Sequence, residues 1–91
     1  MHREFDPHVQ QQIDSVYTRF AHSVRTIRRA KNWTQHELAQ RAGMNKTYLV
    51  RIEAGDNNMT LKTAQKIACA LDIELSVLLR GVELSLVRGV A

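Results

Sequence analysis

The chain has 91 residues, one cysteine and a net charge of +4, which is enough for one small domain with a modest core. A single cysteine excludes an internal disulfide framework, and no apolar run approaches the roughly 20 residues that span a bilayer. The N-terminal sequence MHREFDPH lacks the apolar core of a signal peptide, so we expect a soluble, cytoplasmic protein.

The first predicted element is a long amphipathic helix. Asp6 and Pro7 are a capping carboxylate and a first-turn proline, both typical of a helix start. An unbroken helix from Pro7 to Lys31 would be about 37 Å long at ~1.5 Å per residue. Because this is long for such a domain, we expect either a break near residues 15–18 or an N-terminal arm packed on a partner subunit. Apolar residues recur along one face of this helix, at Val9, Ile13, Val16, Tyr17, Phe20, Val24 and Ile27.

A capping box opens the next predicted helix. Thr34 is followed three residues later by Glu37, so hydroxyl and carboxylate can each satisfy a free backbone N–H. Just before it, Asn32 suits a left-handed position at the end of the first helix, and Trp33 is expected to anchor the core. Gly43 ends the capped helix, because only glycine occupies the left-handed region without strain. The expected inward face comprises Leu38, Ala39 and Ala42.

Another short helix follows after a sharp turn. Asn45 is a good N-cap, and Leu49 and Ile52 provide a buried edge at i, i+3 spacing. Ala54-Gly55 closes this helix. Two short helices joined by a turn of three to four residues predict a helix-turn-helix over residues 34–54.

A further amphipathic helix is predicted between Thr60, its N-cap, and Asp72, which ends it. The segment from Val82 to Val87 alternates apolar and polar residues, as a strand does. We expect it either to pair with the same segment of a second subunit or to be disordered. The inward face of the helix is expected to comprise Leu61, Ala64, Ile67, Ala68 and Leu71, with Cys69 half-buried beside it.

Positive charge is concentrated in the middle of the chain. Residues 19–66 hold ten basic and three acidic side chains, whereas the rest holds three basic and six acidic ones. A basic block that coincides with a helix-turn-helix indicates a polyanionic partner. The alternative is an ordinary solvated surface. A membrane surface is not expected as a partner, because the acidic residues Glu4, Asp6 and Asp14 occupy the start of the chain.

Residues 34–55, TQHELAQRAGMNKTYLVRIEAG, resemble the lambda-repressor/Cro-like helix-turn-helix family, also called XRE. The resemblance extends from about Phe20 to Leu79. It implies an all-α, five-helix DNA-binding domain whose short fifth helix corresponds to residues 73–79. We therefore divide the chain into an N-terminal helical extension (1–18), the DNA-binding domain (19–80) and a short C-terminal tail (81–91).

The face of the second helix opposite Leu49 and Ile52 is predicted to read DNA bases. A planar guanidinium such as that of Arg51 can bind guanine O6 and N7 together, and an apolar side chain such as Val50 can touch a thymine methyl. In the family, residues at these positions read bases. The alternative for each is an ordinary exposed helix residue. The expected base-reading residues are Lys46, Thr47, Val50 and Arg51.

Phosphate contacts are expected on both sides of this face. Gln35 lies in a first helical turn, where free N–H groups and the helix dipole favour an anion, and the resemblance assigns it to the DNA backbone. Tyr48 either packs at the core edge or lays its ring on the backbone. The run Asn45 to Tyr48 is similar to that of restriction-modification controller proteins. The expected backbone contacts are Gln35, Asn45, Tyr48, Asn57, Asn58 and Lys62, which position a protein without reading sequence.

The resemblance also implies an ion pair. In the family an arginine at the position of Arg28 and a glutamate at the position of Glu53 pair between helices and fix the orientation of the reading helix. If the pair is buried, removal of one partner costs about 3–5 kcal/mol.

The sequence gives no support for an enzyme. The four histidines, at positions 2, 8, 22 and 36, form no metal-binding spacing with a cysteine, and no nucleophile motif or glycine-rich phosphate loop is present. We therefore expect no catalytic residues, no metal and no cofactor.

Together these features predict a sequence-specific, double-stranded-DNA-binding transcription regulator, such as a repressor, that acts as a homodimer on a pseudo-palindromic operator. The alternative is the antitoxin of a toxin–antitoxin pair, which binds a toxin protein as well as its own operator. Residues 1–18 and 82–91 lie outside the minimal family domain. Their role therefore distinguishes the regulator from the antitoxin.

Overall fold

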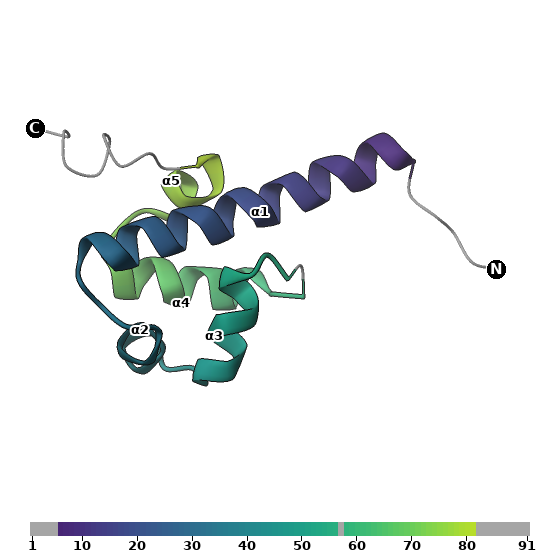
Figure 1. Cartoon of the computed structure of the whole chain (residues 1–91). Coiled ribbons are helices and arrows are strands. Elements are labelled where there is room, and N and C mark those ends of the chain that lie inside the picture. Colours follow the sequence, from purple (N-terminus) through teal and green to yellow (C-terminus); the bar gives the residue numbers. More distant parts are fainter. Residues whose placement is uncertain (1–5, 57, 82–91) are drawn as a thin grey trace, which may run out of the picture.

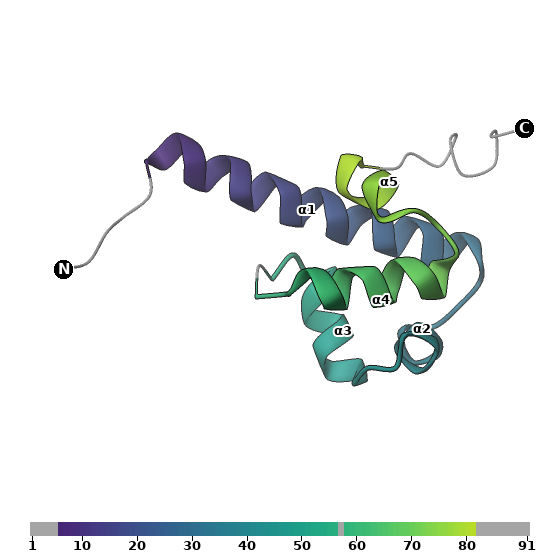
Figure 2. The same cartoon turned by 180° about the vertical axis from the view of Figure 1, so that it is seen from behind.

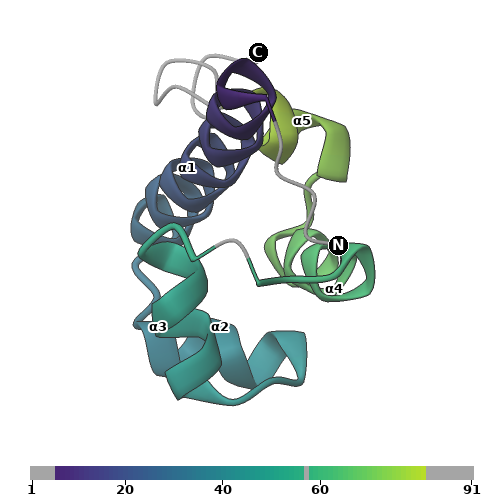
Figure 3. The same ribbon diagram turned by 90° about the vertical axis from the view of Figure 1, so that its right-hand side faces the viewer.

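A computed structural model describes residues 6–56 and 58–81, which form five helices and no strand (Figure 1). They are α1 (Pro7–Ala30), α2 (Gln35–Ala42), α3 (Lys46–Glu53), α4 (Leu61–Leu71) and α5 (Leu75–Arg80). Helix α1 packs against α5, α3 and α4, while α2 packs against α3 and α4. Seen from the side, α2 and α3 lie together at one end of the domain (Figure 3). The expected all-α, five-helix architecture is confirmed for the described residues.

One apolar core joins all five helices. It is formed by residues that recur at helical spacing in the sequence, and nearly all of their surface is removed from water. Burial of each large aliphatic or aromatic side chain contributes about 1.5–3 kcal/mol. The largest contributors are Phe20, Val24, Leu38, Leu49, Ile52, Ile67, Leu71 and Leu78.

Four of the helices end in the same backbone motif. After each, a residue with positive φ lets the following N–H bond to the carbonyl five residues back, which satisfies a free carbonyl at the helix end. The sequence supplies glycine, asparagine or aspartate at each place, the residues that tolerate this conformation best. The four residues are Asn32 (φ 61°), Gly43 (67°), Gly55 (91°) and Asp72 (57°).

The expected break near residues 15–18 is wrong, because α1 is one continuous 24-residue helix. No proline or glycine interrupts it, and Ser15 instead accepts a hydrogen bond from Arg19 Nη1 one turn later. The first half of α1 therefore projects beyond the other helices (Figures 1 and 2). The predicted strand over residues 82–87 lies outside the described residues.

Three burial expectations also need correction. The side chain of Leu61 is 73% exposed, since it lies in the first turn of α4 beside the projecting part of α1. Cys69 is exposed rather than half-buried. Trp33 is only partly buried at the core edge, where the cations of Arg41 and Lys31 lie 4.2 and 5.3 Å from its ring centre.

An open apolar groove of about 500 Å³ lies between the projecting half of α1 and the start of α4. The hydroxyl of Tyr17 donates a hydrogen bond to the Met59 carbonyl across it. The groove is lined mainly by Ile13, Val16, Tyr17, Met59, Leu61 and Leu79.

None of the described helices is long and apolar enough to cross a bilayer.

Candidate nucleic-acid interface

Side-chain caps fix the N-terminal ends of both α2 and α3. The Thr34 N–H donates to Glu37 Oε1 at 2.8 Å, and the Glu37 N–H donates to Thr34 Oγ1 at 3.1 Å, which is the expected capping box. Hydrogen bonding of the Glu37 carboxylate to the backbone N–H and the side chain of Thr34, with the nearby Arg41 charge, lowers the pKa of Glu37 below its ordinary value. Asn45 Oδ1 accepts from the N–H groups of Thr47 and Tyr48 and caps α3.

Helix α3 has one buried and one exposed side. Leu49, Ile52 and Glu53 are buried against the rest of the domain. The four residues expected to read bases are all exposed, and the side chain of Arg51 is 58% accessible. Lys46 lies four residues before Val50, and Thr47 lies four residues before Arg51. Residues four apart point to the same side of a helix, so the four side chains share one surface. This surface, formed by Lys46, Thr47, Val50 and Arg51, is called the α3 face below.

The guanidinium of Arg51 is held by a carboxylate that the sequence reading missed. Its Nε and Nη2 donate to the same oxygen of Asp56, Oδ2, at 3.0 and 2.8 Å. The sequence Arg-Ile-Glu-Ala-Gly-Asp (51–56) indicates this contact, because a left-handed glycine after a helix brings the next residue back over the last turn.

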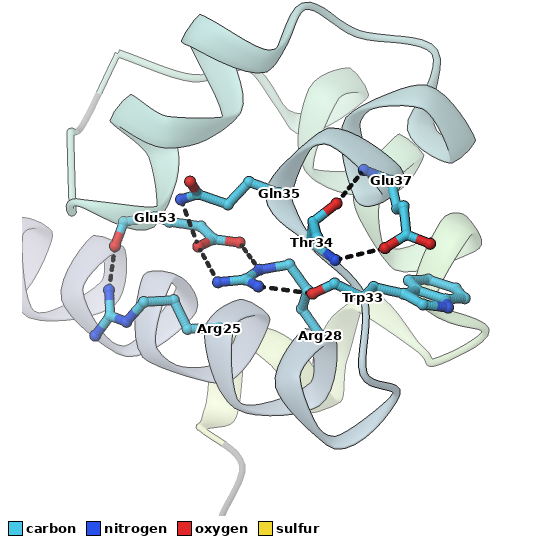
Figure 4. A network of polar contacts seen from close by, with 7 residues as sticks. All are labelled: Arg25, Arg28, Trp33, Thr34, Gln35, Glu37 and Glu53. Carbon is cyan, nitrogen blue, oxygen red and sulfur yellow. Dashed lines mark hydrogen bonds and ion pairs between the residues drawn. The ribbon is translucent and has the colours of Figure 1, made fainter.

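A polar network links the helix-turn-helix to α1 (Figure 4). Arg28 Nε donates to Glu53 Oε2 at 2.7 Å and Nη2 donates to Oε1 at 3.0 Å, so the ion pair is bidentate. Arg28 Nη1 also donates to the Trp33 carbonyl, while Arg25 donates to the backbone carbonyl of Glu53. The pair that the resemblance implied is thus present, and the other partners were missed because side-chain-to-carbonyl contacts leave no periodic pattern.

Gln35 belongs to the same network. Its Nε2 donates to Glu53 Oε1 at 3.1 Å, and its side chain is half-buried (Figure 4). One amide hydrogen is therefore used within the protein, and the free N–H groups of the first turn of α2 remain available to an anion.

The other expected backbone contacts lie at the start of α3 and of α4. Tyr48 is half-buried at the core edge and donates its hydroxyl to the Asn58 carbonyl at 3.3 Å. Lys62 is exposed in the first turn of α4, and Asn45 is occupied as a cap. Asn57 lies outside the described residues.

No cluster of histidine, cysteine, aspartate or glutamate suited to a metal ion occurs among the residues that the structure describes. His36 is exposed on α2, and Cys69 accepts a hydrogen bond from Gln65 on α4.

The groups brought together at the α3 face are hydrogen-bond donors, one methyl-bearing hydroxyl and one apolar side chain. They are suited to recognition rather than to bond breaking.

Comparison with protein families places the described helices in a known group. The family model described as Helix-turn-helix matches residues 24–78, more than half of the chain. A structural relative, the restriction-modification controller protein C.AhdI of Aeromonas hydrophila, is 34% identical, with a TM-score of 0.66. The match covers 70% of this chain and 97% of that one.

Three curated relatives each match between 58% and 66% of this chain. A hypothetical transcription factor of Neisseria meningitidis is 36% identical over 58% of this chain, which spans half the length of that protein. The control protein C.SmaI of Serratia marcescens is 36% identical over 65% of this chain and 70% of its own length. The antitoxin HipB of Escherichia coli is 30% identical over 66% of this chain and 68% of its own length.

Proposed function

The chain belongs to the helix-turn-helix family of the XRE type, a family of DNA-binding regulators rather than enzymes, and from that premise we propose its activity. It is a sequence-specific transcription regulator that binds double-stranded DNA as a homodimer on a pseudo-palindromic operator. The observation that carries this proposal is the α3 face, which is exposed on a helix fixed to the domain by caps, core packing and a buried ion pair.

The α3 face has the size and chemistry of a base-reading surface. A major groove about 12 Å wide admits an α-helix, and its base edges present distinct donor and acceptor patterns. Arg51 can donate two parallel hydrogen bonds to guanine, while Lys46 can reach a guanine acceptor or a phosphate. Thr47 offers a hydroxyl and a methyl, and Val50, at 39% exposure, can contact a thymine methyl.

Backbone contacts on either side orient this face. The N-terminal turns of α2 and α4 expose N–H groups and positive dipole ends, which bind phosphate. Such contacts account for most of the affinity and for its salt dependence, but not for sequence preference. The residues assigned to them are Gln35, Asn45, Tyr48, Asn58 and Lys62, with Asn57 assigned by its place in the sequence.

A homodimer follows from the small reach of one α3 helix, which covers only a few base pairs. Two-fold symmetry puts two such helices about 34–36 Å apart in successive major grooves. The groove beside Leu61 and the projecting half of α1 form an apolar surface that the other described residues leave open. We propose that the second subunit packs on this surface and on the part of the extension (1–18) that lies in α1.

A second function is proposed because the relative HipB is an antitoxin. In that function the projecting half of α1 or the tail (81–91) binds a toxin protein, and the α3 face still binds the operator. If variants that disrupt the projecting half of α1 leave both dimerisation and operator affinity unchanged, that surface serves another protein and the antitoxin function is favoured.

Selection from a random pool of duplexes tests the proposal. The protein should enrich a sequence with two-fold symmetry, and affinity for it should fall linearly with the logarithm of salt concentration, by about 0.9 log units per phosphate contact. A pool without enrichment, together with a flat salt profile, would exclude sequence-specific DNA binding.

A further inference from the structure

Arg51 presents two hydrogen-bonding edges, and among the described residues only one of them has a partner. Each edge of a guanidinium carries two parallel N–H groups. Asp56 accepts from Nε and Nη2, which form the inner edge, through the single oxygen Oδ2. The remaining edge, Nη1 with Nη2, is the pair that can donate to O6 and N7 of a guanine. The Arg51 side chain is 58% exposed, so a base can reach it.

The backbone, rather than side-chain flexibility, brings Asp56 to this place. The Asp56 N–H donates to the Arg51 carbonyl at 3.1 Å, and the Gly55 N–H donates to the Ile52 carbonyl at 3.0 Å. Gly55 has a φ of 91°, a conformation that other residues rarely adopt. The carboxylate is therefore anchored one residue after a fixed turn, and its side chain is 29% exposed.

We propose that Asp56 is a positioning residue for Arg51, which presents the outer guanidinium edge to a guanine and makes the contact selective. This inference rests on the proposed function, because it assumes that the α3 face reads bases. An arginine side chain loses considerable rotamer freedom when it binds, and a partner that already holds it by two hydrogen bonds in the free protein removes part of that cost.

The carboxylate also changes what Arg51 can bind without sequence preference. A free guanidinium is attracted to every phosphate, and this attraction raises affinity for all duplexes alike. A neighbouring negative charge offsets that attraction, whereas a correctly placed guanine still gains two hydrogen bonds. Asp56 thereby raises the ratio of specific to non-specific affinity, and this ratio, rather than the affinity for the selected site alone, is the quantity that should respond.

The test compares the full-length wild-type chain with Asp56→Asn, which keeps the side-chain size and removes the charge. The probes are a labelled duplex selected from a random pool, the same duplex with each G·C pair replaced in turn by A·T, and a random duplex of equal length. Asp72→Asn is the matched control, since it changes net charge equally at the end of α4 and asparagine tolerates its positive φ. Thermal unfolding of each variant checks that the fold is retained.

We expect Asp56→Asn to lower the preference for one G·C pair roughly fivefold to tenfold, while affinity for the random duplex rises and its salt dependence steepens. Asp72→Asn should leave that preference unchanged. The inference is overturned if Arg51→Ala abolishes the preference but Asp56→Asn does not alter it, or if Asp56→Asn only strengthens specific binding. If Arg51→Ala itself leaves every preference intact, the base-reading role fails and the inference fails with it.

Discussion

Arg28 and Glu53 meet at 2.7 Å although they lie 25 residues apart, and their side chains are 9% and 1% exposed. The contact joins α1 to the last turn of α3. Because Glu53 is adjacent to Ile52 and two residues after Arg51, a shift of this pair would move the α3 face relative to the domain. The ion pair is thus the main polar link between the core and the proposed reading surface.

Removal of either partner should be costly. Arg28→Ala or Glu53→Ala leaves a buried charge without its partner, at an expected cost of about 3–5 kcal/mol in the free energy of unfolding. The double variant should lose clearly less than the sum of the two, because neither charge is then stranded. Urea denaturation of the four proteins measures this coupling. Strictly additive losses would show that the pair does not act as a unit.

The capping box predicts a pH dependence. Hydrogen bonds from Thr34, and the Arg41 charge, lower the pKa of Glu37 in the folded state from its ordinary value of 4.5. A lowered folded pKa contributes stability that is fully present above pH 4.5 and is lost as the pH falls through the lowered value. Glu37→Gln should therefore be less stable than wild type near pH 6, and the gap should narrow near pH 3. A gap that is constant with pH would contradict this role of the charge.

Alanine substitutions of Lys62 and Arg51 should impair DNA binding in different ways. Lys62→Ala should weaken binding to all duplexes alike and reduce the slope of log affinity against log salt by about 0.9. Arg51→Ala should instead reduce the discrimination between a selected site and its G·C variants by about 1–3 kcal/mol. Fluorescence anisotropy at several salt concentrations separates the two effects. Equal losses of discrimination in both variants would remove the distinction between positioning and reading.

Leu61 provides a test of the proposed dimer surface. Its side chain is 73% exposed, so Leu61→Glu should leave the folding of one subunit nearly unchanged while placing a charge in the apolar groove. Analytical ultracentrifugation should show a shift from dimer to monomer, accompanied by weaker operator binding. Gln11→Glu, an exposed substitution on the polar side of α1, is the control. If both variants remain dimeric, the second subunit binds elsewhere.

Much of the fold was predictable because its signals are local. The capping box at Thr34, the cap at Asn45 and the left-handed residues Asn32 and Gly43 all act within a few residues, so the sequence alone indicates them. The core positions follow equally from helical spacing, which is why the buried faces of α2 and α3 agree with expectation.

The expectations that failed depend on contacts that periodicity does not encode. Leu61 fits the apolar spacing of α4, but spacing alone does not tell whether an apolar side chain faces its own core or an open groove. The length of α1 was judged against the size of the domain, although nothing in residues 15–18 interrupts a helix. The contact of Asp56 with Arg51 has no periodic signal either, because it depends on the backbone geometry at Gly55.

Reading of guanine from the major groove by Arg51 is most directly tested with 7-deazaguanine, which lacks the N7 acceptor but keeps the base pair. Each guanine of the selected duplex is replaced in turn, and affinity is measured for wild type and Arg51→Ala. We predict that one symmetric pair of replacements weakens wild-type binding and has no effect on the variant. If no replacement weakens wild-type binding, or if the variant is weakened equally, Arg51 does not read guanine in the major groove.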